Sequence, residues 1–523
     1  MPEKNLHDRA EEIFESAIKL TADSFELAGL HQEIQQCYQR LHEPMRVAVM
    51  GKIKAGKSSL MNALLGESVV ATGVEELTFN VNWFKYGEIP SLVVHFKSDR
   101  PPETKTLEEL ELLTRRREEN QAFLVEIEYI EVLYPNPILK TFNLIDTPGL
   151  DSAFSEDSRN TLDFLQLSPE DLTKVTQKEA LKADAILYLF SQSIATSDQG
   201  VLEEFIGQKL ENSTPINSIG VLTKVDNYWP DKLDPLDTGQ AIAQRLLSEH
   251  SQLRNLLYTI FPVSGLLGWG AKTLSPEDFA TLEQLAALPM EEFESLTKSA
   301  KRFNKEYSDR ANIPASINRK QLLSKLGLYG ICQGWELIQR GIKNQDELKD
   351  KLLEFSGLPK LQDLVVSHFG NRAFLIKLNN SLKKILVACS QSQQKNRSEK
   401  DAKILQQIAI MFEELEVKEH SFKELQVLRD YYDSKLNFNQ NEVKQLLEVT
   451  GEYGTYYGYR LGLDDTASIP EMLNIAEERI NYWYKKAEDI MRINRQTIKA
   501  ARIMARSYER ILYHLKEAYK HLW

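Results

Sequence analysis

Hydrophobic residues recur at helical spacing near the start of the chain. Over residues 9–43 the apolar positions follow one another at steps of three, four or seven: Ile13, Ala17, Leu20, Leu27, Leu30, Ile34, Cys37 and Leu41. This stripe predicts a helix that buries one face, and because a lone helix of this length is marginal in water, its partners should lie elsewhere in the chain. Cys37 lies on the stripe, so we interpret it as a core residue of a helix bundle and not as a reactive thiol.

The end of the chain shows the same helical period and little strand pattern. It predicts three long helices, at about 360–398, 401–448 and 467–522. At 1.5 Å per residue the last of these would extend about 75 Å. Residues 356–359 contain Gly and Pro, which end helices, and they are the hinge candidate. A loop at residues 451–462 is rich in Gly and Tyr, and both a packed turn and an anchor at a half-wet interface are compatible with it.

A second, basic stripe runs along the last predicted helix. Its members are Arg492, Arg495, Lys499, Arg502 and Arg506. Three kinds of partner stay open for these cations: the glutamates of the preceding helix, anionic lipid, or another subunit. The glutamates in question are Glu413, Glu414, Glu416, Glu419 and Glu424.

The middle of the chain alternates short apolar runs with helical stretches, which is typical of an α/β domain with a largely parallel sheet. The strand candidates are residues 46–50, 79–84, 91–96, 123–133, 142–146, 183–190, 216–222 and 258–263. The charged residues 100–120 predict a surface helix. The predicted domains are an N-terminal helix (1–44) packing into a stalk, an α/β domain (45–355) with a helical extension at about 270–350, and a helical bundle (356–523). The stalk would be an elongated, all-α bundle built from the N- and C-terminal helices.

Composition narrows the classes of protein that fit this pattern. With 523 residues, 42% hydrophobic and 27% charged, the chain suits a globular protein of two or three domains. The net charge of −12 argues against nucleic acid as a partner. Three widely spaced cysteines suggest neither a disulfide framework nor a zinc site. No uncharged apolar run of about 18 residues and no signal-peptide pattern is present, so we expect a cytoplasmic protein without a membrane span.

The first element that carries chemistry is the segment from residue 46 to residue 65. An apolar run leads into Gly-Lys-Ile-Lys-Ala-Gly-Lys-Ser at residues 51–58, and an amphipathic helix follows. This is the G-x-x-x-x-G-K-[ST] pattern between a strand and a helix, in which backbone N–H groups surround phosphate oxygens. The pattern predicts that Lys57 reaches the β- and γ-phosphates and that Ser58 ligates Mg²⁺. The contact set of this loop is predicted as Gly51, Lys54, Ala55, Gly56, Lys57, Ser58 and Ser59.

Two further elements follow at the ends of predicted strands. Asp146 ends an apolar run and is followed by Gly149, so the carboxylate would hold a water of the Mg²⁺ shell and the Gly N–H would meet the γ-phosphate. Residues 216–222 lead into Thr223-Lys224-Val225-Asp226. The Asp226 carboxylate can accept from N1–H and the exocyclic amine of guanine, a donor pair that adenine lacks. The Lys224 stem would lie over the purine plane.

A fourth, weaker element is Ser264-Gly265 at the end of the last predicted strand, where a backbone N–H would meet the guanine oxygen. Together the four elements predict a protein that binds GTP or GDP with Mg²⁺. The expected fold is an α/β P-loop GTPase head with a mostly parallel sheet flanked by helices, carried on the helical-bundle stalk.

These elements, with the segment 73–87, resemble the dynamin superfamily of large GTPases, and residues 56–67 with 72–74 resemble its bacterial branch. Residues 322–330, 356–361 and 460–464 are similar to the isoniazid-inducible type found in mycobacteria. The resemblance implies GTP hydrolysis, self-association through the GTPase heads with itself or a related dynamin-like partner, and action on membranes. It also implies a cytoplasmic protein that is peripheral on the inner face of the cell membrane.

Two departures bear on catalysis. Leu150 stands where Ras-like GTPases carry a glutamine that orients water, and an apolar side chain cannot do this. Some relatives of the atlastin and guanylate-binding types have an arginine finger at the position of Lys54, so Lys54 is a candidate catalytic group, with a solvated loop lysine as the alternative. For the switch threonine that ligates Mg²⁺, Thr78 is preferred and Thr72 is the competitor. The predicted catalytic residues are therefore Lys57, Thr78 and Lys54.

Four functions were weighed against these features. The leading hypothesis is a GTPase that couples hydrolysis to self-association and membrane remodelling or tethering. The alternatives are a GTP-controlled switch that recruits a protein partner without membrane action, and a scaffold with negligible turnover. A P-loop ATPase is disfavoured by residues 223–226.

Overall fold

The computed structural model describes residues 6–51, 54–67, 69–70, 80–98, 100–114, 121–147, 183–191, 216–307, 312–393, 398–432, 434–489 and 491–520. The chain forms two compact units. We call Arg46–Ser213 with Ser218–Val365 the sheet unit. We call Met1–Met45 and Val366–Trp523, with the short segment Thr214–Asn217, the helical unit.

The described part of the sheet unit is built on nine strands in the order β4-β3-β5-β2-β6-β1-β7-β8-β9. The strands are β1 Met45–Gly51, β2 Val81–Tyr86, β3 Ser91–Phe96, β4 Glu103–Lys105, β5 Ile127–Tyr134, β6 Phe142–Asp146, β7 Ala185–Ser191, β8 Ser218–Thr223 and β9 Ile260–Val263. The pairs β1–β7, β7–β8, β8–β9 and β2–β5 are parallel, whereas β2–β6, β3–β4 and β3–β5 are antiparallel. The mostly parallel sheet predicted from the sequence is confirmed.

Parallel pairing brings the carboxyl ends of β1, β7 and β8 to one edge of the sheet. Gly51 is level with Leu189, and Ser191 is level with Thr223. β8 is buried along its whole length, as expected of an uninterrupted apolar run in a sheet covered on both faces. The loops that follow β1 and β8 therefore start beside each other although more than 160 residues separate them.

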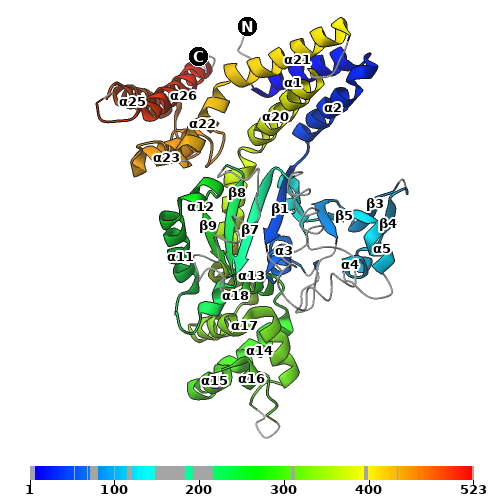
Figure 1. The fold of residues 1–523 in the computed structure, drawn as a ribbon. Helices are drawn as coiled ribbons and strands as arrows, with labels where there is room; N and C mark the ends of the chain where they lie inside the picture. Colours follow the sequence, from blue (N-terminus) through cyan, green and yellow to red (C-terminus); the bar gives the residue numbers. More distant parts are fainter. Residues whose placement is uncertain are drawn as a thin grey trace. The chain divides into compact units, whose positions relative to one another are not determined.

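Helices of the sheet unit fall into two groups. Those within the α/β part are α3 Lys57–Leu65, α4 Leu110–Thr114, α5 Gln121–Glu126, α6 Ile138–Thr141, α11 Pro235–Glu249 and α12 Ser251–Leu256. The later group is α13 Gly265–Lys272, α14 Pro276–Ala286, α15 Met290–Thr297, α16 Ala300–Phe303, α17 Ser316–Gln339, α18 Gln345–Ser356 and α19 Leu358–Val365. This later group encloses its own apolar core and gathers beyond one end of the sheet (Figure 1).

Three predictions within the sheet unit need correction. The expected surface helix over residues 100–120 is, in its described part, the edge strand β4, a 3₁₀ turn and the short α4. Charged residues at 103–105 pair with β3, so tertiary pairing overrides their helical preference. The strand expected at 123–133 begins only at Ile127, after α5. The expected hinge at 356–359 is packed: Ser356 and Leu358 are fully buried, and the boundary between the units falls at Val366.

The helical unit contains two groups of helices that pack within themselves. One group is α1 Leu6–Thr21, α2 Ala28–His42, α20 Ala373–Gln393 and α21 Glu399–Lys418, which lie side by side (Figure 1). The other is α22 His420–Tyr432, α23 Gln440–Val449, α24 Tyr457–Arg460, α25 Ile469–Glu488 and α26 Arg495–Lys520. A π-helical turn, Val366–Gly370, precedes α20.

The long helices predicted from the sequence are broken into shorter ones in the structure, and two of them form hairpins. The N-terminal helix is broken into α1 and α2, and the helix expected at 467–522 is broken into α25 and α26, which pack on each other. The segment 401–448 similarly forms α21, α22 and α23, and 360–398 forms α19, the π-helical turn and α20. In a helical hairpin both helices bury their apolar residues against each other. The helical period of apolar residues therefore continues in the sequence through the turn, and it does not show where the first helix ends.

The Gly/Tyr-rich loop at 451–462 is a packed turn. Arg372 donates from Nε to the carbonyl of Thr450 at 3.0 Å, and Arg460 donates from Nε to the carbonyl of Val449 at 2.8 Å. Of the two interpretations that the sequence left open, packing within the unit is the one the structure favours. Among the described helices, none combines the length and apolar character needed to cross a lipid bilayer.

Candidate nucleotide site

The loop between β1 and α3 has the backbone geometry of a phosphate-binding loop. Gly51 and Gly56 have φ of 153° and 93°, and Lys54 between them has φ of 63°. A Cβ at Gly51 would lie 2.6 Å from the carbonyl oxygen of Leu189. At Gly56 the nearest atoms to a Cβ are 3.7 Å away, so protein atoms do not crowd this position. Glycine is favoured there because the backbone that precedes α3 is left-handed.

Lys57 begins α3 and turns back over this loop. Its side chain is buried, and Nζ donates a hydrogen bond to the carbonyl oxygen of Gly51 at 3.2 Å. Burial lowers the pKa of Lys57, while the nearby Asp146 carboxylate acts in the opposite direction. A buried ammonium held beside open N–H groups at a helix N-terminus is suited to the oxygens of a polyphosphate.

Asp146 is the last residue of β6 and is fully buried. Burial raises the pKa of Asp146 to about 6, and the opposing effects of Lys57 and Asn82 are smaller. Neither carboxylate oxygen has a hydrogen bond of normal geometry to any described residue. A buried carboxylate without a donor is costly unless a ligand satisfies it, so the donor set fits a hydrated Mg²⁺.

Several residues of the predicted site fall outside the part of the chain that the structure describes. These are Gly149, the candidate switch threonines Thr78 and Thr72, and Leu150. Their predicted roles remain predictions. The neighbouring Thr147 is described, and its hydroxyl donates to the carbonyl of Val49 at 2.9 Å, which ties the end of β6 to β1.

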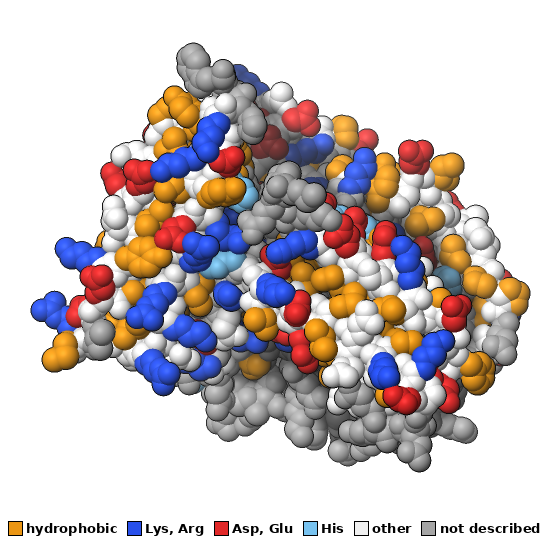
Figure 2. All heavy atoms as spheres, turned by 90° about the horizontal axis from the view of Figure 1, so that it is seen from above, with side chains coloured by type: hydrophobic (Ala, Val, Ile, Leu, Met, Phe, Trp, Pro, Cys, Tyr) orange, Lys and Arg blue, Asp and Glu red, His pale blue; other side chains and the backbone are white. Residues whose placement is uncertain are grey.

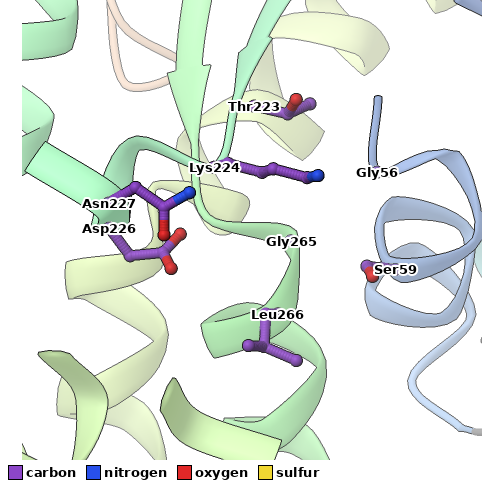
Figure 3. A pocket seen from close by; sticks show the side chains of 8 residues that line it. All are labelled: Gly56, Ser59, Thr223, Lys224, Asp226, Asn227, Gly265 and Leu266. Carbon is purple, nitrogen blue, oxygen red and sulfur yellow. The ribbon is translucent and has the colours of Figure 1, made fainter. Parts of the chain in front are cut away.

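Thr223 joins the loop after β8 to the loop after β1. Its hydroxyl lies 2.5 Å from the carbonyl oxygen of Ala55 and 3.1 Å from that of Phe190. Lys224 follows with a left-handed backbone, φ 58°, and its Cε lies about 4 Å from the Cβ position of Gly56. Figure 3 shows the Lys224 side chain extending from the end of β8 toward the Gly56 side of the pocket. Burial lowers the pKa of Lys224.

Asp226 lies in the turn after Lys224 and is directed into the same pocket (Figure 3). Burial raises the pKa of Asp226, and a hydrogen bond from Ser264 partly offsets the shift. The Asp226 carboxylate is half-buried beside Lys224, and its free acceptor positions suit a ligand that brings paired N–H donors.

The structure bears on which backbone N–H of the Ser264–Gly265 element is available for the guanine oxygen. The N–H of Ser264 donates to the carbonyl of Ser356 at 2.9 Å, and its hydroxyl caps α13 by accepting from Leu267 N–H. The N–H of Gly265, which lines the pocket, remains the predicted donor. A Cβ at Gly265 would lie 3.1 Å from the Leu60 nitrogen, so glycine is needed where α13 meets α3.

These segments enclose one pocket of about 290 Å³ (Figure 3). It is lined by Gly56, Ser59, Thr223, Lys224, Asp226, Asn227, Gly265 and Leu266. All of these are predicted site residues except Asn227 and Leu266, which directly follow such residues. Gly327, where α17 is kinked, was not predicted for the site, and its Cβ position is 4.0 Å from an oxygen of Asp226. No local motif marks Gly327, because its place in the site depends on how α17 packs.

Comparison with known proteins identifies a family for the segment that carries most of this site. Residues 47–225 match the Dynamin family, a span that holds β1, the phosphate loop, Asp146 and the Thr223–Val225 turn. Residues 47–225 therefore form a domain of the Dynamin family. The protein is a GTPase of the dynamin type, and this domain implies binding of a guanine nucleotide.

Sequence similarity to known proteins covers most of the chain. The isoniazid-induced protein IniC of Mycobacterium tuberculosis is 28% identical over 470 residues, which are 90% of each chain. Dynamin-like protein 2 of Campylobacter jejuni is 30% identical over 192 residues, covering 35% of this chain and 30% of that protein. A solved structure of an oligomerised bacterial dynamin pair aligns with 97% of this chain and 90% of its own, at 14% identity and a TM-score of 0.32, a value too low to add to the assignment.

Proposed function

We propose that this dynamin-type GTPase couples GTP hydrolysis to self-association through its sheet unit and to peripheral attachment at an anionic membrane surface. The observation that carries the nucleotide part is the single pocket in which Gly56 and Ser59 face Asp226 across Lys224. Phosphate-binding and base-binding groups are then held at the two ends of one ligand.

Within this site we assign roles to individual side chains. Lys57 would bind the β- and γ-phosphates. Ser58 and Thr78, with Asp146 through a water, would hold Mg²⁺, which neutralises charge on the phosphates when bound. Thr72 stays the competitor of Thr78. Because Leu150 cannot orient water, correct placement of the attacking water would depend on backbone groups or on a second subunit.

Turnover should therefore depend on protein concentration. The isolated chain is expected to hydrolyse GTP slowly, on the order of 10⁻³ per second as in unassisted Ras-like GTPases. Heads that pair across the nucleotide face would exclude water and fix the switch loops, so the specific activity should rise about tenfold or more over a hundredfold increase in concentration. Steady-state phosphate release, with light scattering in parallel, measures both quantities.

Substitution of Lys54 tests whether this side chain contributes to hydrolysis in the associated protein. Its side chain is exposed on a left-handed backbone at the rim of the phosphate loop, where it can face the γ-phosphate or a partner. Lys54→Ala should lower the rate of the associated protein while GDP affinity is retained, because the contact belongs to the transition state. A specific activity that stays flat while light scattering reports a change of assembly contradicts activation by self-association.

The basic stripe on α26 supports the membrane part of the proposal. Arg492, Arg495, Lys499 and Arg502 are exposed and make no ion pair with any described residue. Three of the five glutamates considered as their partners pair with other cations: Glu414 with Lys418, Glu419 with Arg9, and Glu424 with Arg460. The remaining member, Arg506, pairs with Glu509 on its own helix.

The surface around these cations has the character of a headgroup-binding patch. Met491, in the turn between α25 and α26, is 96% exposed. Figure 2 shows Lys and Arg side chains interspersed with hydrophobic side chains on the face seen from above. Unpaired cations beside an exposed apolar side chain suit anionic lipid, at about 1 kcal/mol per cation near the surface.

Liposome flotation tests this part directly. The protein should float with vesicles that contain an anionic phospholipid and not with neutral vesicles, and binding should fall as salt is raised. Reversing Arg495, Lys499 and Arg502 to Glu should reduce flotation about tenfold or more. Reversing Lys349 and Lys351, which form surface ion pairs in the sheet unit, is the control and should leave it nearly unchanged.

The same measurement separates the membrane proposal from the alternative switch that recruits a protein partner. Absence of flotation with and without GTP, in a preparation that hydrolyses GTP, favours the switch. Flotation that is insensitive to the α26 reversals assigns the membrane contact to another surface.

A further inference from the structure

Three potential metal ligands converge in the helical unit, outside the nucleotide motifs of the sheet unit. His7 and Glu11 are one helical turn apart on α1, and His42 is the last residue of α2. The Glu11 Oε1 atom lies 3.4 Å from His7 Nδ1 and 4.0 Å from His42 Nε2, and all three donor atoms lie within 4.8 Å of one another. Among the described residues this is the only His, Cys, Asp and Glu cluster of three with such spacing.

The neighbouring side chains hold both imidazoles in place. The His7 ring stacks on Phe374 of α20 with centroids 4.7 Å apart, and the His42 ring meets Tyr38 edge to face at 5.0 Å. Lys377 of α20 donates from Nζ to the carbonyl oxygens of Leu41 and Glu43 at 2.7 and 2.6 Å, which fixes the end of α2 where His42 lies. The three ligands are thus supported by three helices and not by a loose surface loop.

We propose that His7, Glu11 and His42 form a binding site for a divalent first-row transition ion of the Zn²⁺ type. Two imidazole nitrogens and one carboxylate oxygen are a donor set that zinc uses in proteins, with water in the fourth position. Donor atoms around tetrahedral zinc are about 3.3 Å apart. The cluster needs a contraction on the order of 1 Å, which exposed side chains on adjacent helices can make by small rotamer changes.

The exposure of the cluster fits an open site with a water ligand. The side chains of His7, Glu11 and His42 are 50%, 36% and 45% exposed. Imidazole ligands disfavour Mg²⁺ and Ca²⁺, which take oxygen donors, so this site is chemically distinct from the magnesium ligands proposed at the nucleotide.

The position of the cluster gives the ion a mechanical effect. The chain turns between α1 and α2 at residues 22–27, which closes one end of the hairpin by covalent connection. His7 at the start of α1 and His42 at the end of α2 mark the open end. A bound ion would close that end as a clip, restrict fraying of the first turn of α1, and hold the segment from which the chain continues into β1.

The experiment uses full-length protein freed of metal with a chelator and kept free of nucleotide. Zn²⁺ titration by calorimetry should give one site per chain with a dissociation constant in the micromolar range or below, and Co²⁺ should give visible absorption of a tetrahedral site. Amide hydrogen exchange in the first turn of α1 should slow when Zn²⁺ is added. Mg²⁺ and Ca²⁺ at the same concentration should give neither effect.

Variants locate the ion. His42→Ala and Glu11→Gln should weaken Zn²⁺ binding about tenfold or more, with the circular dichroism and GDP affinity of the protein retained. His514→Ala removes a histidine from α26 and should leave binding unchanged. Retained binding in His42→Ala, loss of binding in Asp146→Asn, or half-saturation only at millimolar Zn²⁺ would each overturn the proposal, the second by moving the ion to the nucleotide site.

Discussion

Replacing Lys57 by alanine is expected to remove GDP and GTP binding in the micromolar range, with an affinity loss of about 10³-fold. The ammonium is buried and already aligned on the phosphate loop through its bond to Gly51. Its removal would leave phosphate charge without a buried counter-charge, a change that costs about 3–5 kcal/mol in comparable buried pairs. Equilibrium binding of a fluorescent guanine nucleotide measures the loss.

Two further variants test whether the loss of nucleotide binding is specific to Lys57. Lys54→Ala removes a lysine from the same loop and should leave GDP affinity within a few-fold. Thr78→Ala should retain GDP binding but lose most of the Mg²⁺-dependent turnover. If Thr78→Ala turns over normally and Thr72→Ala does not, the switch threonine is Thr72. GDP binding by Lys57→Ala at wild-type affinity would contradict the phosphate-loop assignment.

Replacing Asp226 by asparagine should change which base the protein prefers. In the proposed site the carboxylate would accept two N–H donors from guanine. An amide offers one acceptor and one donor and so would match xanthine, which has a carbonyl at position 2. We expect GDP affinity to fall about 100-fold or more and xanthosine diphosphate affinity to rise. Calorimetry with GDP, XDP and ADP measures the three affinities on one sample.

Asp231→Asn is the matched control, since Asp231 is an exposed residue a few positions later in the same connection. It should leave all three affinities unchanged. Equal binding of GDP and ADP by the unmodified protein would contradict guanine recognition by Asp226. Unchanged preference in Asp226→Asn would place the base elsewhere than beside Gly327 and Leu266.

Much of the site was predictable because its parts are local in the sequence. The sequence of residues 51–58 predicts a phosphate-binding loop because glycines at 51 and 56 precede a helix. In the structure both glycines have positive φ. Asp146 and Thr223 were found because each ends an apolar run, and strand ends on one side of a parallel sheet must meet. Each motif of the pocket could therefore be recognised from a short stretch of sequence.

Other parts depended on packing that no local pattern records. Ser264 looked free to meet guanine, but its N–H is taken by Ser356, 92 residues later. Gly327 was not predicted for the site, but the kink at this residue places its Cβ position 4.0 Å from an oxygen of Asp226. In the helical unit the period of the apolar stripe was right, but it could not say where α25 ends and α26 begins, because both arms of a hairpin bury the same stripe.

The sequence by itself determined the chemistry of the nucleotide site and the secondary-structure class of each region, since side-chain identity and hydrophobic period are properties of neighbouring residues. Only the tertiary structure decided which distant groups share a surface. His7, Glu11 and His42 converge because α1 and α2 fold back on each other. Arg495, Lys499 and Arg502 have no ion pair among the described residues, while Glu419 and Glu424 pair with Arg9 and Arg460 of other helices. Such convergence depends on helix ends and register, which are set by packing energy summed over the whole unit.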